Sequence, residues 1–292
     1  MLTAAPIDPD QTLQFDDPAL AEQVRAQIES PDFNGCLKAL DGDPLKIART
    51  LLPLAAAFAV SPVSTIRVGA VALGDSGQFY LGANLEFPGT MLGTTLHAEQ
   101  SAVLNAWIHG EQRLVRLAVS ETPCGHCRQF LAELSCAGEL QLSFGETLAV
   151  LPDLLPVPFG RIPQHGQGLL DRPPVELESI RPMGDALARR ALNAAQRSYT
   201  PYTRGAEGFV IEGDNGQFYV GRAAESVAFN PSVPAVVGAL NQRNLSSGRN
   251  FSISGCAHAR LVTALNCNQE LSATLMARIT KAPVRQVLME QA

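Results

Sequence analysis

The chain has 292 residues, 46% of them hydrophobic and 17% charged, which is enough apolar material for one large domain or two modest ones. Its formal net charge of −6 argues against a nucleic-acid partner, because an acidic chain gains little from the release of counterions. The most apolar run, LLPLAAAFAV, is too short to span a bilayer and includes Pro53. The N-terminal stretch MLTAAPIDPDQTLQFDD is acidic, whereas a secretory signal begins basic and continues apolar. We therefore expect a cytoplasmic protein with reduced cysteines and no membrane partner.

The first part of the chain is predicted to be helical from about residue 16 to residue 60. Asp17 and Asp43 are each followed by proline, a pair typical of a helix start in which the aspartate caps the first turn. From Arg67 the pattern changes, because RVGAVAL and GQFYLGAN are short and rich in β-forming residues. The turn sequence GDSG between them predicts a hairpin.

Helices and strands are then expected to alternate. One helix is predicted over residues 96–109, where Gly110 stops it, and another over residues 124–135. The stretches RLAVS and LQLSF have the composition of buried strands. A hairpin followed by alternating helices and strands predicts a sheet covered by helices, which is a layered α/β core.

The second half of the chain repeats the first. After a segment with seven prolines over residues 152–182, a new helix is predicted over residues 185–198. The stretch GDSGQFYLGANLE (74–86) aligns without gaps on GDNGQFYVGRAAE (213–225), which indicates duplication of one unit rather than chance similarity of two hairpins. On the same offset, Val236 and Gly238 replace His97 and Glu99, and no second Pro-Cys-x-x-Cys follows. We expect the second half to have lost any metal chemistry of the first.

Two stretches contain candidate metal ligands. LHAEQSAVLNAW places His97 at the start of a helix, and TPCGHCRQF places Cys124 and Cys127 in the first turn of another. Helix N-termini favour thiolates, and zinc binds imidazole nitrogen and thiolate sulfur in tetrahedral geometry. His126 should point away from the metal, and Cys136 is too far along the chain to reach it. Three ligands without a fourth are typical of a catalytic zinc site that keeps a position for water.

Glu99 stands two residues after the histidine, where a carboxylate can take a proton from that water and pass it to a leaving group. Alone, His-x-Glu is more often a surface pair, and Cys-x-x-Cys is often a redox pair or part of a structural zinc site. Together, His-Ala-Glu and Pro-Cys-x-x-Cys form the signature of the zinc nucleobase deaminases.

On these motifs, and on VGAVALGDSGQFYLGANLEF and the degenerate AESVAFNP, the chain resembles the cytidine deaminases that have two core domains per subunit. The resemblance covers nearly the whole chain. It implies a three-layer α/β/α core that is duplicated, with a small N-terminal helical segment. The domains expected from it are an N-terminal helical segment (1–48), a catalytic zinc domain (49–151), a Pro-rich linker (152–183) and a degenerate second domain (184–292).

The resemblance also implies the roles of particular residues. One zinc per chain is held by His97, Cys124 and Cys127, hydroxide formed at the zinc attacks C4 of the base, and Glu99 shuttles the proton. Further substrate contacts implied are Asn84 and Glu86 on ribose hydroxyls, and the backbone of Ala98 and Cys124 on the base and the transition state. Ile66 stands where the family usually has an aromatic residue against the base.

Two aromatic residues, Phe159 and Phe229, resemble those that the family brings to the pocket from the linker and the second core, although both could instead be core residues. The resemblance implies a homodimer in which the second domain of one chain completes the active site of the other. The expected reaction is hydrolytic deamination of free cytidine and 2′-deoxycytidine, releasing ammonia, in pyrimidine salvage.

Two other functions remain open from the residues. A deaminase of RNA or single-stranded DNA carries the same motifs, but it would need a basic groove for the flanking nucleotides. A non-enzymatic protein could use zinc only to stabilise its fold, but it would need neither Glu99 nor an open coordination position.

Overall fold

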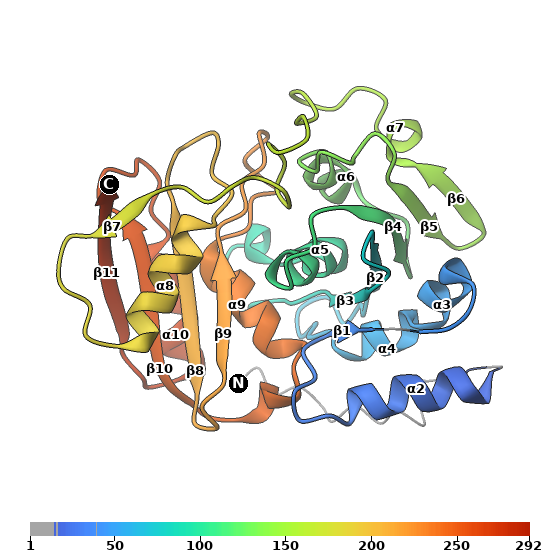
Figure 1. Ribbon diagram of the computed structural model, residues 1–292, viewed down its shortest axis with the longest axis horizontal. Coiled ribbons are helices and arrows are strands. Elements are labelled where there is room, and N and C mark those ends of the chain that lie inside the picture. Colours follow the sequence, from blue (N-terminus) through green and yellow to red (C-terminus); the bar gives the residue numbers. More distant parts are fainter. Residues whose placement is uncertain (1–14, 16, 39) are drawn as a thin grey trace. The chain divides into compact units, whose positions relative to one another are not determined.

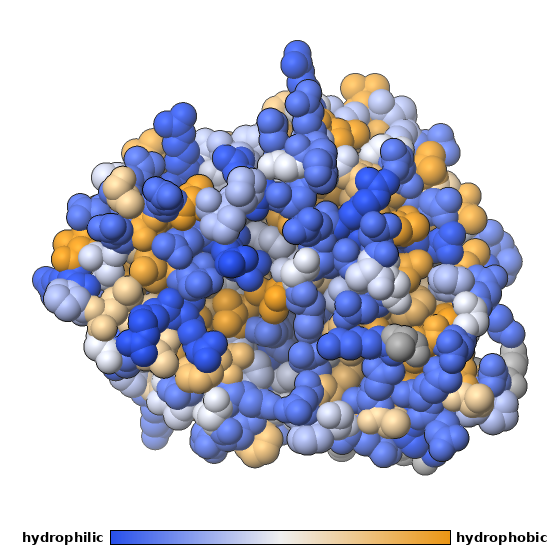
Figure 2. All heavy atoms as spheres, viewed as in Figure 1, coloured by the Kyte–Doolittle hydropathy of each residue, from blue (hydrophilic) through white to orange (hydrophobic). Residues whose placement is uncertain are grey.

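The computed structural model describes residue 15 and residues 17–38 and 40–292, and the chain forms two compact units within them (Figure 1). The first unit runs to Asp171 and includes Leu245–Ser247. The second comprises Arg172–Asn244 and Gly248–Ala292. No helix within these described residues is long and apolar enough to cross a membrane. On the face drawn in Figure 2, hydrophilic residues predominate and hydrophobic ones form separate patches.

The first unit is built on a six-stranded sheet in the order β1-β3-β2-β4-β5-β6. Neighbouring strands are antiparallel except β4 and β5, which are parallel. The strands are β1 (Cys36–Leu37), β2 (Gly69–Gly74), β3 (Phe79–Ala83), β4 (Leu114–Val119), β5 (Gln141–Phe144) and β6 (Thr147–Val150).

Helices cover both faces of this sheet (Figure 1). On one face α2 (Pro18–Ile28), α3 (Pro44–Thr50) and α4 (Leu52–Ala57) bury a core that includes Val24, Ile47 and Leu54 against Val71 and Leu81. The other face is covered by α5 (Ala98–Ile108), with α6 (Gly125–Leu131) beside it. Two short helices, η1 (Leu92–Thr94) and α7 (Leu151–Leu154), complete the unit. Burial of apolar side chains on both faces of the sheet gives the three layers.

The second unit has a five-stranded sheet in the order β7-β11-β10-β8-β9. α8 packs on one face, burying Ala191 and Leu187 against Val210 and Ala257, while α9 packs against β9 and β8. Its elements are β7 (Leu177–Ser179), α8 (Ala186–Gln196), β8 (Glu207–Gly213), β9 (Phe218–Arg222), α9 (Ala235–Asn244), η2 (Ser247–Asn250), β10 (Ile253–Leu261), α10 (Gln269–Ile279) and β11 (Val284–Gln291).

The duplication expected from the sequence is present in the topology. Strands β3-β2-β4-β5 of the first unit and β9-β8-β10-β11 of the second follow the same order, with the last pair parallel and the others antiparallel. In both units a glycine of the second hairpin strand lets the next helix approach closely. A Cβ on Gly82 would overlap the backbone of Ala98 and Ala102, and a Cβ on Gly221 would overlap that of Ala235 and Ala239.

These contacts correct the register that the sequence alignment predicted for the second half. The connection between Ala224 and Val233 is two residues shorter than the matching one between Leu85 and Leu96. The gapless alignment is therefore wrong beyond the hairpin. Pro234 precedes α9 where His97 precedes α5, and Val236, rather than Gly238, matches Glu99.

Most local predictions are confirmed. Asp17 accepts hydrogen bonds from the N–H groups of Ala19 and Leu20, and Asp43 accepts them from Leu45 and Lys46, so both cap their helices. Some elements differ, because a short strand β1 interrupts the helical region, and α6 ends at Leu131 rather than at residue 135. The segment expected to be a linker contains α7 and β7, and β7 pairs with the edge strand β11.

Candidate active site

His97 lies at the N-terminus of α5, in an extended backbone conformation (φ −83, ψ 156). Its N–H donates to Oε1 of Gln100, 3.1 Å away, which fixes the first turn of the helix. The close approach of α5 to Gly82 on β3 fixes the position of the helix on the sheet, and so of the His97 backbone at its start.

Cys124 and Cys127 lie at the start of α6, where the sequence predicts them. Arg128 holds this turn by donating from Nε to the carbonyl of Pro123 (2.8 Å) and from Nη1 to that of Leu154 (2.9 Å). Cys124 is the N-cap and is exposed, whereas Cys127 is fully buried. The structure therefore presents one sulfur to solvent and keeps the other inside.

The predicted ligands come together. One atom each of His97, Cys124 and Cys127 lie within 4.8 Å of one another, and His97 Nδ1 is 3.5 Å from Cys124 Sγ. His126 does not join this group, because its ring stacks on that of His97 with 4.7 Å between centroids. Cys136 is buried and also outside the group.

The protonation of these groups suits a metal. Hydrogen bonds from Cys127 and His97 lower the pKa of the Cys124 thiol to about 3, so this sulfur is a thiolate. The hydrogen bond to Cys124, together with burial, raises the pKa of Cys127, which favours its protonated thiol. Metal ions displace such protons from thiols, and one imidazole with two thiolates is a donor set that zinc prefers. The residues present therefore fit zinc.

Glu99 is buried in the first turn of α5, with 5% of its surface exposed. Burial raises the pKa of its carboxyl, which lies within hydrogen-bonding reach of Cys127. A carboxyl group in this environment can hold a proton and return it, as a general acid–base catalyst must.

Asn84 and Glu86 follow β3, and both are buried and contact the loop of residues 61–68. Asn84 Nδ2 donates to the carbonyl of Ile66 (2.9 Å), and its Oδ1 accepts from Val68 N–H (2.9 Å). Glu86 Oε2 accepts from the N–H groups of Val63 (2.8 Å) and Ser64 (3.0 Å), while Oε1 accepts from the Ser64 hydroxyl. Burial alone would raise the pKa of Glu86, but these hydrogen bonds lower it, so the group is a carboxylate.

Ile66, Phe159 and Phe229 are 59%, 66% and 61% exposed, so none of them is a core residue of this chain. Phe159 is nevertheless tied to the metal-binding helix. Its N–H donates to Oε1 of Gln129 on α6 (2.9 Å), and Gln129 Nε2 donates to its carbonyl (3.0 Å). No sequence signal marks Gln129. The motifs do not mark Ser64 either, although the repeat does contain a signal: Thr203, which also has a hydroxyl group, stands at the matching position.

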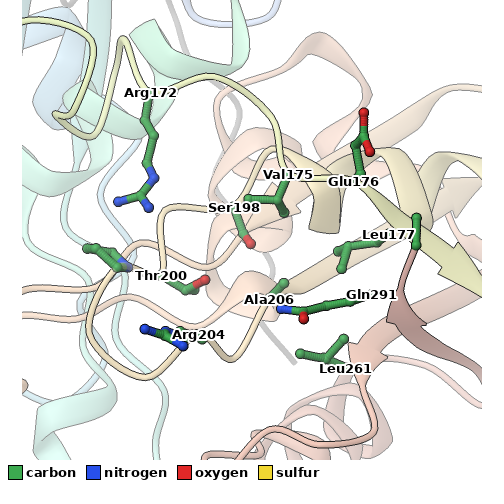
Figure 3. A pocket seen from close by; sticks show the side chains of 12 residues that line it. Arg172, Val175, Glu176, Leu177, Ser198, Thr200, Arg204, Ala206, Leu261 and Gln291 are labelled. Carbon is green, nitrogen blue, oxygen red and sulfur yellow. The ribbon is translucent and has the colours of Figure 1, made fainter.

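The second unit has none of these donors at the matching places. Pro234 directly precedes α9, and Val236 lies in its first turn. Asn268 caps α10 where Cys124 caps α6. A pocket of about 580 Å³ in this unit has no histidine or cysteine in its lining. Figure 3 shows Arg172 and Arg204 on one side of it, near Thr200.

A duplicated three-layer α/β fold, with a His-Cys-Cys donor group and a buried carboxyl beside it, defines a zinc-dependent nucleobase deaminase. Sequence comparison agrees with this class. A family model described as the cytidine and deoxycytidylate deaminase zinc-binding region matches residues 46–140, and a second model of the same description matches residues 154–270.

Curated relatives match most of the chain. A cytidine deaminase of Pectobacterium carotovorum subsp. carotovorum (strain PC1) is 43% identical over 260 residues, which cover 85% of this chain and 86% of the relative. One of Pectobacterium atrosepticum is 38% identical over 288 residues, 94% of this chain and 95% of the relative. The crystal structure of cytidine deaminase from Mycobacterium tuberculosis has 37% sequence identity, covering 41% of this chain and 99% of that one, with a TM-score of 0.38. The chain belongs to the cytidine deaminase family and is a zinc-dependent hydrolytic deaminase.

Proposed function

We propose that the chain deaminates free cytidine and 2′-deoxycytidine to uridine and 2′-deoxyuridine, with release of ammonia, in cytoplasmic pyrimidine salvage. The observation that carries this proposal is the buried carboxyl of Glu99 beside the donor group of His97, Cys124 and Cys127. These three residues would hold zinc, which would supply a Lewis acid that makes water a better nucleophile.

The proton transfers fall to Glu99. A water oxygen forms a bond to C4 of the base, and Glu99 takes the water proton and delivers it to the ring. When the bond between C4 and the exocyclic nitrogen breaks, the same carboxyl moves the remaining proton of the new C4 hydroxyl to the amino group, so that the C4 carbonyl forms and ammonia leaves. Ala98 and Cys124 lie at helix starts, where backbone N–H groups have no intrahelical partner, and we assign these two groups to the base.

The sugar is assigned to Asn84 and Glu86. A carboxylate has about four lone-pair sites, and Glu86 uses three of them on its own loop, so one remains for a ribose hydroxyl. The Asn84 side chain also has one N–H and one oxygen lone pair left for a ribose hydroxyl, after its hydrogen bonds to Val68 and Ile66. Ile66, on the same loop, is assigned to the face of the base, and Phe159, tied to α6, is assigned to the pocket wall.

Free nucleosides are favoured over nucleotides and polynucleotides, since a carboxylate beside the sugar and a net charge of −6 both disfavour phosphate. The test measures deamination by ultraviolet absorbance with cytidine, 2′-deoxycytidine, CMP and a cytidine-containing oligonucleotide. We expect kcat/KM to be highest for the two nucleosides. Comparable efficiency on CMP or on the oligonucleotide would contradict the substrate class, and a zinc-loaded protein inactive on all four would favour a structural metal.

The active unit is proposed to be a homodimer in which the stretch SVAFNP of the partner's second unit completes each site. Phe229 supports this, because it combines an exposed ring with a left-handed backbone (φ 60). Its N–H donates to the carbonyl of Ser226 (2.8 Å), and its carbonyl accepts from Ser232 N–H (2.9 Å), so the strained turn is fixed. Strain retained at an exposed aromatic residue is more typical of a contact surface than of a free loop.

Subunit mixing tests this arrangement. Glu99→Ala keeps Phe229, and Phe229→Ala keeps Glu99, so a mixed dimer contains one site with both residues only if Phe229 acts on the neighbouring chain. We expect activity to reappear when the two inactive variants are co-expressed. If mixed dimers are shown to form and remain inactive, Phe229 acts within its own chain or not at all.

A further inference from the structure

A buried carboxylate holds the loop that follows α4 in the first unit, and another holds the loop that follows α8 in the second unit. In the second unit Glu225 Oε2 accepts from the N–H groups of Tyr202 (3.0 Å) and Thr203 (3.2 Å), and Oε1 accepts from the Thr203 hydroxyl. These are the same three hydrogen bonds that Glu86 accepts in the first unit from Val63 and Ser64. Glu86 and Glu225 are each 5% exposed.

The hydroxyl group has a second contact in each unit. Ser64 Oγ also accepts from the N–H of Ile66, and Thr203 Oγ1 accepts from the N–H of Gly205, both at 3.0 Å. Each hydroxyl therefore joins the buried carboxylate to the end of its loop. We call Ser64 with Glu86, and Thr203 with Glu225, the two carboxylate clamps.

Each clamp encloses a residue with a left-handed backbone. Thr65 has φ 63 and Arg204 has φ 57, and they occupy matching places directly after the clamp hydroxyl. This conformation is costly for a residue with a side chain, and most so for a β-branched one such as Thr65. The loop must therefore be held in place by its surroundings, and the clamp supplies the hydrogen bonds that do so.

The second unit keeps its clamp although it lacks the metal donors and has Ala223 where Asn84 stands. The clamp is therefore part of the scaffold and does not require the chemistry. In the first unit the same scaffold carries two substrate contacts, because the loop bears Ile66 and the clamped carboxylate has one lone pair left. If the Ser64 hydroxyl is lost, the carboxylate can rotate and the loop can relax.

We propose that Ser64 is a positioning residue for substrate affinity, acting through Glu86 and the loop of residues 61–66, an inference that rests on the proposed function. Ser64 itself makes no contact with the reacting atoms. Its hydroxyl fixes the direction of the remaining Glu86 lone pair toward the sugar and the placement of Ile66 against the base.

The test compares steady-state kinetics of zinc-loaded Ser64→Ala with the wild type. Loss of one hydrogen bond to a charged group should raise KM for cytidine about tenfold, with kcat changed by less than about threefold. Ser64→Thr, which installs the residue found in the second clamp, should recover most of the wild-type KM. Ser64→Cys replaces the hydroxyl by a somewhat larger thiol, which is a weaker hydrogen-bond donor, and should give an intermediate KM. This variant keeps the inference testable if Ser64→Ala folds poorly.

Thr203→Ala is the matched control, because it breaks the same clamp in the unit without the donor group. It should lower the melting temperature of the protein and leave KM for cytidine within about twofold of the wild type, less than the loss of one hydrogen bond at the site. An unchanged KM in folded Ser64→Ala would overturn the inference. An equal rise of KM in Thr203→Ala would also overturn it, since the effect would then be one of general stability.

Hydrogen exchange separates this inference from the proposed function. A wild type without activity on cytidine would reject the proposed function alone, because amide exchange in the loop of residues 61–66 still reports on the clamp. Ser64→Ala should exchange faster at Val63 and Ile66 than the wild type does. Unchanged exchange at both amides would overturn the inference whatever the substrate.

Discussion

The two units share a scaffold, but among the described residues only the first has a group that could hold a metal. Both have the same order of core strands and the same carboxylate clamp. Both also have a glycine, Gly82 or Gly221, that lets α5 or α9 approach the sheet closely. At the start of that helix the first unit has His97 and Glu99, and the second has Pro234 and Val236. The second unit shows that this fold forms without the donor group, unlike small zinc domains whose folding depends on the metal. We therefore expect zinc in the first unit to serve the chemistry more than the fold.

The largest effect expected from this comparison is the loss of a ligand. Cys127→Ala should reduce bound zinc from one per chain to nearly none and abolish deamination, while the far-ultraviolet circular dichroism spectrum remains that of a folded α/β protein. Its melting temperature should fall, because zinc binds the native state in preference to the unfolded one. Elemental analysis, an activity assay and a melting curve measure the three changes.

Cys256→Ala is the control for this change, since Cys256 is equally buried but lies in the second unit. It should keep one zinc per chain. Two tightly bound zinc ions per wild-type chain would break the comparison between the units.

Glu99→Gln should lower kcat by about 10⁴-fold or more, at the upper end of what a general acid–base group contributes, because one carboxyl serves both proton transfers. Its zinc content and melting temperature should stay close to those of the wild type, since the amide has nearly the same shape. The matching change in the second unit, Val236→Ala, should reduce stability and leave kcat unchanged. Near-normal turnover by zinc-loaded Glu99→Gln would remove Glu99 from the mechanism.

Alanine at the two close-approach glycines should destabilise both units. Gly82→Ala and Gly221→Ala each force a strand and a helix apart, at a cost of about 1–3 kcal/mol in the free energy of unfolding. Only Gly82→Ala moves the helix that carries His97 and Glu99, so only this variant should also lower kcat in the folded fraction. Gly93→Ala, with open space around the new Cβ, is the control in denaturation and activity measurements.

The smallest effect is expected at the helix caps, which are not part of the donor group. Asp43→Ala and Asp185→Ala should each reduce the free energy of unfolding by about 1 kcal/mol, because a backbone N–H of the first turn loses its acceptor. Asp185→Ala should cost somewhat more, since this carboxylate also pairs with Arg285. Urea denaturation measures both losses, and Asp43→Asn should retain most of the stability. A change in kcat in either alanine variant would contradict the assignment of chemistry to the donor group and Glu99.

Features that depend on neighbours along the chain could be predicted from the residues alone. Helix caps, the two hairpins and the Cys-x-x-Cys turn are local, so Asp17, Asp43 and the pair of Cys124 and Cys127 could be placed from residue types and spacing. The shared GQFY stretch revealed the duplication, because the close packing of a strand against helices restricts its residues. The grouping of His97 with the cysteines followed from the combination of two specific motifs.

Contacts between residues far apart in the sequence could not be predicted in this way, because they depend on how the helices and strands pack. The two-residue shortening before α9 leaves no trace in a gapless alignment, and it became visible through the contacts of Gly82 and Gly221. Strand β7 pairs with β11, and Gln129 binds the backbone of Phe159, because backbone groups at sheet edges and in loops take whichever partner the fold brings near. The sequence marked Glu86 as polar, but its three hydrogen bonds depend on where the loop passes, which the packing of the helices on the sheet decides.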